Sequence, residues 1–111
     1  SRTMRDMLLM AVVEAGYRVI QAVDGVDGLE TLAAEGADVV ITDINMPNMD
    51  GFELIEAVRK VPEFRGTPIL VLSTEFSDDK KARARTAGAT GWITKPFDAV
   101  KLGAAIRRVC P

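Results

Sequence analysis

Hydrophobic and polar residues follow two different patterns along the chain. Short runs rich in valine, isoleucine and leucine are typical of strands buried in a sheet, and they recur at residues 17–23, 39–43, 69–72 and 91–94. The segments around them place apolar residues every three or four positions, which predicts amphipathic helices. The expected helices are residues 2–15, residues 25–35, and three more that follow Asp50, Ser77 or Asp78, and Asp98.

Residues that commonly start or stop helices mark the expected boundaries. Asp24 is placed to cap the helix of residues 25–35, and Gly36 follows where a stop is expected. Asp50 and Glu53 have the spacing of a capping box, in which each side chain accepts a hydrogen bond from the other residue's backbone. We therefore interpret Asp50 as a helix cap rather than a reactive carboxylate.

Strands that alternate with helices indicate βαβ units and a parallel sheet with right-handed crossovers. The 111 residues are 48% hydrophobic, which is enough to build the core of one domain. The pattern therefore predicts a single α/β domain over residues 1–111.

Composition and charge narrow the chemistry. A formal net charge of -2 gives no general attraction to nucleic acid or to an anionic membrane, and no apolar run reaches the roughly 18 residues of a membrane span. The absence of histidine excludes a Ser-His-Asp triad and removes the commonest zinc ligand. A lone cysteine, Cys110, forms no disulfide within the chain, which favours a reducing, cytoplasmic location.

Three of the expected strands end in polar residues that suit phosphoryl transfer. Asp43, Ser73 and Lys95 follow successive strands, and the carboxyl ends of parallel strands lie along one edge of a sheet. Asp43 would act as the nucleophile, Lys95 would neutralise one phosphoryl oxygen, and the Ser73 hydroxyl would donate to another. The alternative is an ordinary ion pair between Asp43 and Lys95 beside a strand-end hydroxyl.

The order of these motifs resembles a response-regulator receiver domain, closest to the single-domain chemotaxis type known as CheY. The stretches that carry the resemblance read ITDINMPNMDG at residues 41–51, LSTE at residues 72–75 and GWITKPF at residues 91–97. With the elements between them, they cover almost the whole chain. The resemblance implies a flavodoxin-like, doubly wound parallel sheet with the strand order 2-1-3-4-5 known for that family.

The same resemblance implies roles for individual residues. Asp43 would accept a phosphoryl group from a histidine kinase, Lys95 would contact the phosphate, and Ser73 would be the switch hydroxyl. Trp92 stands where the family has the aromatic residue of the switch. Mg²⁺ would be held by Asp43 and by the backbone carbonyl of Asn45, together with an acidic pair that the family carries at the end of its first strand.

Residues 1–5 resemble the segment that directly follows this first strand in receivers. Neither the strand nor the acidic pair is therefore found within residues 1–111. The strands of residues 17–23 and 39–43 would flank the first strand. Without it, we expect one of three arrangements: another segment of the chain fills the position between these two strands, the two strands pair directly, or a strand is borrowed by swapping or dimerising. The other explanation is that the native protein has residues before Ser1. Without the pair, we expect weak Mg²⁺ binding and impaired phosphorylation.

Three residues beside the site are expected to set how fast the phosphoryl group is lost. The resemblance places Asn45 and Glu75 along the path of the attacking water. Thr74 is larger than the residue common at its position in the family, and we expect its bulk to hinder that water.

The resemblance implies a response regulator of two-component, chemotaxis-type signalling, whose partners are a histidine kinase and a flagellar switch protein or other target. Its readout face would include Lys80, Lys81, Trp92 and Lys95. Such a chain is not a conventional enzyme, and it would catalyse its own phosphorylation and dephosphorylation only with the acidic pair present. The alternatives are a non-phosphorylated interaction or assembly module and a flavodoxin-like enzyme, although that enzyme would need a glycine-rich phosphate loop.

Overall fold

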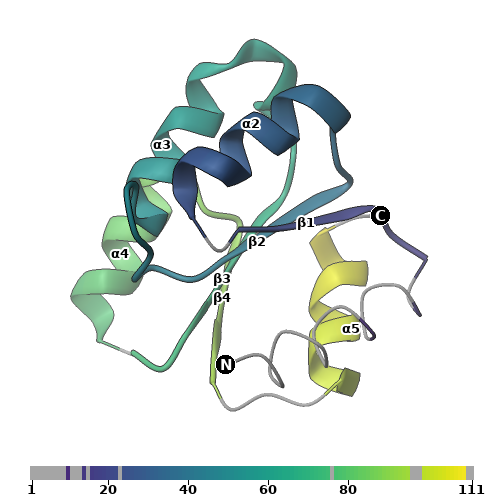
Figure 1. The fold of residues 1–111 in the computed structure, drawn as a ribbon. Coiled ribbons are helices and arrows are strands. Elements are labelled where there is room, and N and C mark those ends of the chain that lie inside the picture. Colours follow the sequence, from purple (N-terminus) through teal and green to yellow (C-terminus); the bar gives the residue numbers. More distant parts are fainter. Residues whose placement is uncertain are drawn as a thin grey trace.

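The computed structural model describes residues 10, 14, 16–22, 24–75, 77–95 and 99–109. Its strands are β1 (Val19–Ala22), β2 (Val39–Thr42), β3 (Ile69–Ser73) and β4 (Gly91–Thr94). They form one parallel sheet in the order β1-β2-β3-β4 (Figure 1). The prediction of an α/β domain built on a parallel sheet is thereby confirmed.

Helices cover both faces of this sheet. They are α2 (Gly25–Glu35), α3 (Gly51–Lys60), α4 (Asp78–Ala87) and α5 (Ala99–Val109), with a short 3₁₀ helix, η1 (Pro62–Phe64), after α3. Figure 1 shows α2, α3 and α4 on one face and α5 on the other. The strand order explains this arrangement, because right-handed crossovers that all advance in one direction place their helices on one face.

The two central strands are buried on both faces. Every residue of β2 and β3 is buried, which explains why their sequences are continuous apolar runs rather than alternating ones. Val40 and Val71 belong to the core beneath α2, α3 and α4. Ile41 belongs to the second core, with Leu102 and Ile106 of α5. This double burial gives the strand ends a rigid support.

β1 pairs directly with β2. The register joins Val19 to Val39 at one end of the pair and Ala22 to Thr42 at the other. Of the arrangements expected for these strands, the described residues therefore show direct pairing, whereas the family order places the first strand between them. The carboxyl ends of all four strands consequently follow one another along one edge of the sheet.

The predicted helix caps agree with the structure. The Asp24 side chain caps α2, and Asp50 and Glu53 form the reciprocal capping box of α3. Of the two candidates for α4, Ser77 is the cap and Asp78 is the first helical residue. These caps fix where each helix begins relative to the strand before it.

Two predictions fall mainly outside the described ranges. These are the helix of residues 2–15, of which Met10 and Glu14 are described as helical, and the cap at Asp98. No helix in the described part of the chain is long and apolar enough to cross a membrane.

Candidate functional site

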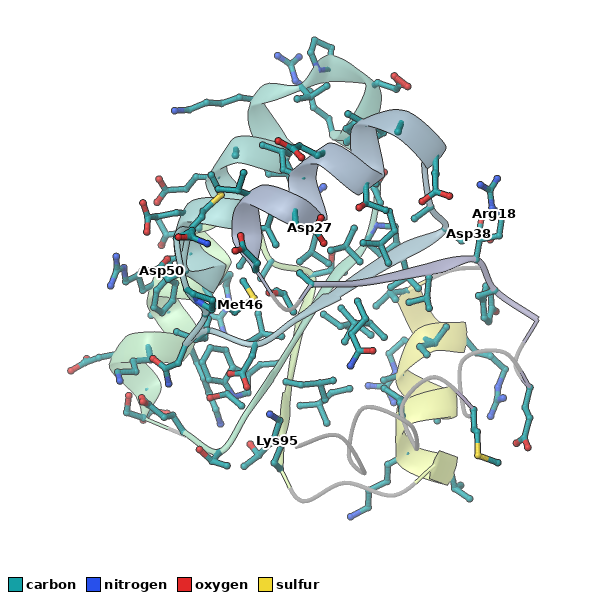
Figure 2. All side chains as sticks on the ribbon, in the orientation of Figure 1. Arg18, Asp27, Asp38, Met46, Asp50 and Lys95 are labelled. Carbon is teal, nitrogen blue, oxygen red and sulfur yellow. The ribbon has the colours of Figure 1, made fainter. Side chains whose placement is uncertain are left out.

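Two predicted site residues meet at the carboxyl edge of the sheet. Asp43 directly follows β2 and Lys95 directly follows β4, where Figure 2 shows it at the strand end. The Lys95 Nζ lies 2.7 Å from Asp43 Oδ2, so the two form a hydrogen-bonded ion pair. The Asp43 side chain keeps 35% of its surface exposed and the Lys95 side chain 18%. The pair is therefore accessible from solvent.

The Asp43 carboxylate is oriented by its own loop. Its Oδ1 accepts a hydrogen bond from the Ile44 N–H at 2.7 Å, and the Asp43 carbonyl accepts one from the Thr42 hydroxyl at 2.8 Å. One carboxylate oxygen is thus held by the backbone and the other by an ammonium group. A carboxylate with a fixed direction and an accessible side meets the geometric requirement for a nucleophile toward phosphorus.

Ser73 lies at the end of β3, between the strands that carry the ion pair. It is 1% exposed, and its backbone carbonyl accepts a hydrogen bond from the Lys95 N–H at 2.8 Å. The bond that its hydroxyl oxygen makes within the described residues comes from the Glu75 N–H, at 3.1 Å, rather than from the ion pair. The structure thus brings Ser73 to the same edge and binds its hydroxyl to the loop that follows β3.

Glu75 connects three residues that the sequence pattern treats separately. Its N–H donates to Ser73, its carbonyl accepts from the Trp92 indole N–H at 3.1 Å, and its carboxylate pairs with Lys80. Trp92 is half-buried and packs against the core beneath α2, α3 and α4. This junction was missed because its partners depend on the path of the loop, and no local signal in the sequence reports that path.

The loop between β2 and α3 is tightly closed on the phosphoacceptor candidate. The Gly51 N–H donates to the Ile44 carbonyl at 2.8 Å, and a Cβ atom on Gly51 would lie 2.2 Å from the Asp43 carbonyl oxygen. A glycine is therefore required where α3 begins. Figure 2 shows Met46 and Asp50 in this loop, and Asp50 serves there as the cap.

The same loop makes a second contact, with the start of α2, that the sequence did not predict. The Asn48 side-chain amide donates a hydrogen bond to Asp24, the cap of α2. This bond is the main reason why the pKa of the Asp24 carboxyl lies below its ordinary value. The available signals were an asparagine in a turn and an acid ahead of a helix, and neither names the other as its partner.

Residues 1–107 match the family model described as the response regulator receiver domain. Protein PilG of Pseudomonas aeruginosa is 32% identical over 111 residues, which are 100% of this chain and 82% of that protein. The chain therefore belongs to the response-regulator receiver domains.

Solved structures are similar over nearly the whole chain. The chemotaxis response regulator CheY4 of Vibrio cholerae is 42% identical with a TM-score of 0.89, covering 98% of this chain and 91% of that one. A response regulator protein from Burkholderia multivorans is 47% identical with a TM-score of 0.80, covering 100% and 89%. The predicted CheY-like fold and the predicted class, a phosphoacceptor receiver of two-component and chemotaxis-type signalling, are confirmed.

Receiver domains bind Mg²⁺. The receiver domain of the sensor histidine kinase PA1611 of Pseudomonas aeruginosa was solved with a magnesium ion coordinated in its active site cleft; it is 21% identical, covers 99% of this chain and 90% of that one, and has a TM-score of 0.86. At this level of identity, the similarity shows that the two domains share a fold.

Asp43 and Asn45 are the two residues expected to bind Mg²⁺ in this chain. Asn45 lies exposed in the loop after Asp43, and these two residues would contribute one carboxylate and one carbonyl. The described residues contain no group of three or more acidic, cysteine or histidine side chains that could hold a metal ion. Because Mg²⁺ prefers an octahedral set of oxygen ligands, Asp43 and Asn45 alone do not fit a complete site.

Proposed function

We propose that this receiver is switched when a histidine kinase phosphorylates Asp43. The observation that carries the proposal is the Asp43–Lys95 pair, in which a backbone-held, accessible carboxylate lies 2.7 Å from an ammonium group. An Asp43 oxygen would attack the phosphorus of a phosphohistidine, the P–N bond would break, and the imidazole would leave. Lys95 supplies positive charge where the phosphoryl oxygens arrive.

Ser73 and Trp92 then transmit the change. A phosphoryl oxygen on Asp43 offers the Ser73 hydroxyl a strong acceptor, and turning toward it weakens the 3.1 Å bond from the Glu75 N–H. Trp92 donates to the carbonyl of the same Glu75, so its indole moves when Glu75 moves. Phosphorylation at the sheet edge thereby changes the surface beside α4.

The surface that a target would read lies on α4 and β4. A cavity of about 240 Å³ opens there, and its lining includes Lys81, Arg85 and Trp92. Lys80 is close by on the same helix, where it pairs with Glu75. A cytoplasmic protein target, of which a flagellar switch protein is the first candidate, would bind this partly basic face.

The test of this function is phosphorylation of the 111-residue chain by a small phosphodonor such as acetyl phosphate. We expect slow addition of one phosphoryl group, detected by intact mass and mapped to Asp43, and a change in Trp92 fluorescence. Because Asp43 and Asn45 supply few of the ligands that Mg²⁺ needs, we expect a Mg²⁺ titration of the fluorescence to saturate only at high concentration.

Each arm of this experiment has its own contrary result. No phosphorylation at saturating Mg²⁺ would favour the interaction-module alternative. A full change in Trp92 fluorescence that saturates at low Mg²⁺ concentration would contradict weak metal binding, and it would leave the assignment of Asp43 as phosphoacceptor intact.

Replacing Thr74 with alanine is expected to shorten the life of the phosphorylated state. Thr74 is exposed directly after Ser73, and a smaller side chain gives the attacking water more room. Loss of the phosphoryl group should accelerate by about two- to fivefold, which corresponds to less than about 1 kcal/mol of barrier. The decay is measured after removal of the phosphodonor, with Thr86→Ala, at an exposed threonine of α4, as the control. An unchanged or slower decay would contradict the role of Thr74.

A further inference from the structure

The start of α2 contacts the loop that carries Asp43. Asp24 caps this helix, since its Oδ1 accepts from the Val26 N–H at 2.8 Å and from the Asp27 N–H at 3.3 Å. Its other carboxylate oxygen, Oδ2, accepts the hydrogen bond from the Asn48 side-chain amide. One carboxylate therefore both begins a helix and binds a loop that lies 24 residues further along the chain.

Asn48 is in a conformation that needs such support. Its φ is 67°, and it is the only non-glycine residue with a positive φ in the part of the chain that the structure describes. The Met49 N–H donates to the Pro47 carbonyl at 2.7 Å, which closes a three-residue turn centred on Asn48. Turns of this kind are strained and persist where the surroundings hold them. The Asp24 carboxylate supplies that hold.

The backbone packing around this contact is equally close. A Cβ atom on Gly25 would lie 2.4 Å from the Met49 carbonyl oxygen, so the first residue of α2 is seated directly on the loop. At the other end, the Gly51 N–H closes the loop on Ile44. Residues 44–50 are thus held at two points, by α2 and by the beginning of α3.

We propose that Asp24 is a positioning residue for the phosphoacceptor. The Asp24–Asn48 contact fixes the loop of residues 44–50, and the first N–H of that loop, from Ile44, orients the Asp43 carboxylate at 2.7 Å. This inference rests on the proposed role of Asp43. A displacement of about 1 Å at a reacting group can cost up to about a hundredfold in rate, so loss of a loop contact is sufficient to slow the transfer.

Two substitutions remove the contact from opposite sides and preserve the local backbone. Asp24→Ser keeps a good helix cap but is too short to reach Asn48. Asn48→Gly keeps a residue that adopts positive φ and removes the amide donor. The matched control is Asp27→Ser, because Asp27 is an exposed acid in the first turn of the same helix and makes no side-chain hydrogen bond to another described residue.

Phosphorylation of Asp43 by acetyl phosphate is the first readout. We expect each single variant to react about five- to tenfold more slowly than the wild type, and the double variant to react no more slowly than either, because all three lack the same contact. Asp27→Ser should react at the wild-type rate. Wild-type rates in both single variants, or fully additive losses in the double variant, would overturn the proposal.

Hydrogen exchange of the loop is the second readout, and it does not depend on phosphorylation. The Met49 and Gly51 amides should exchange faster in the three contact variants, with the thermal midpoint close to that of Asp27→Ser. Unchanged exchange would overturn the inference even where phosphorylation slows. A wild-type chain that accepts no phosphoryl group would instead refute the proposed function, and the exchange data would still decide whether Asp24 holds the loop.

Discussion

Replacing Asp43 with asparagine is expected to abolish phosphorylation of the chain. The amide lacks the anionic oxygen that attacks phosphorus, and it cannot form an acyl phosphate, so the rate should fall by about a thousandfold or more. The substitution changes shape very little, and Asp43 is partly exposed, so the fold should remain stable. Phosphoryl transfer is measured in a single turnover with a labelled phosphodonor, and circular dichroism checks the fold.

Asp50→Asn provides the matched control for this experiment. Asp50 belongs to the same loop but accepts from the Glu53 N–H at 2.8 Å as a helix cap, and asparagine caps helices as well as aspartate does. This variant should therefore react at close to the wild-type rate. Retained labelling in Asp43→Asn, or a label that maps to Asp50, would show that Asp43 is not the phosphoacceptor.

Local signals were sufficient to predict where α2 and α3 begin. α2 and α3 begin directly after Asp24 and Asp50, whose carboxylates accept hydrogen bonds from N–H groups two or three residues ahead. A cap of this kind involves only residues that are close together in the sequence, so it can be predicted from the sequence. α3 ends at Lys60, and Pro62 opens η1, where a missing N–H carries little cost.

The edge shared by Asp43, Ser73 and Lys95 was also predictable, because it follows from parallel strands alone. The partners of these residues were less accessible to prediction. Nothing in the local pattern says that the Ser73 hydroxyl binds the Glu75 N–H, since this depends on the path of a loop. The direct pairing of β1 with β2 was one of several open alternatives, because strand neighbours are set by the whole sheet rather than by either strand.

Contacts between distant loops carry the least sequence signal, and Arg59 is the clearest example. Its Nη1 donates to the carbonyls of Phe64 at 2.8 Å and Thr67 at 2.7 Å, and its Nε donates to the Gly88 carbonyl at 2.9 Å. A Cβ atom on Gly88 would lie 2.6 Å from the Arg59 Cγ, so the glycine leaves room for the side chain. One guanidinium group thereby joins the segment after α3 to the end of α4.

The energetic importance of Arg59 follows from what it satisfies. Its pKa lies below the ordinary value because the group is partly desolvated, yet an arginine remains protonated in a protein. A planar guanidinium offers donors in a fixed fork, which matches several carbonyls at once. Hydrogen bonds from charged groups contribute about 1.5–3 kcal/mol each where they are shielded from water, and removing the donor leaves carbonyls of the loop unsatisfied.

Arg59→Met is therefore expected to destabilise the fold by about 2–4 kcal/mol, because methionine fills similar space but has no hydrogen-bond donor for the carbonyls. Arg59→Lys should lose about half as much, since an ammonium keeps the charge but not the fork. Urea unfolding measures both values, and Arg65→Met, at an exposed arginine of the same segment, should change stability by less than about 0.5 kcal/mol. Equal losses at positions 59 and 65 would mean that the loop carbonyls are satisfied by water, and that Arg59 does not hold the two segments together.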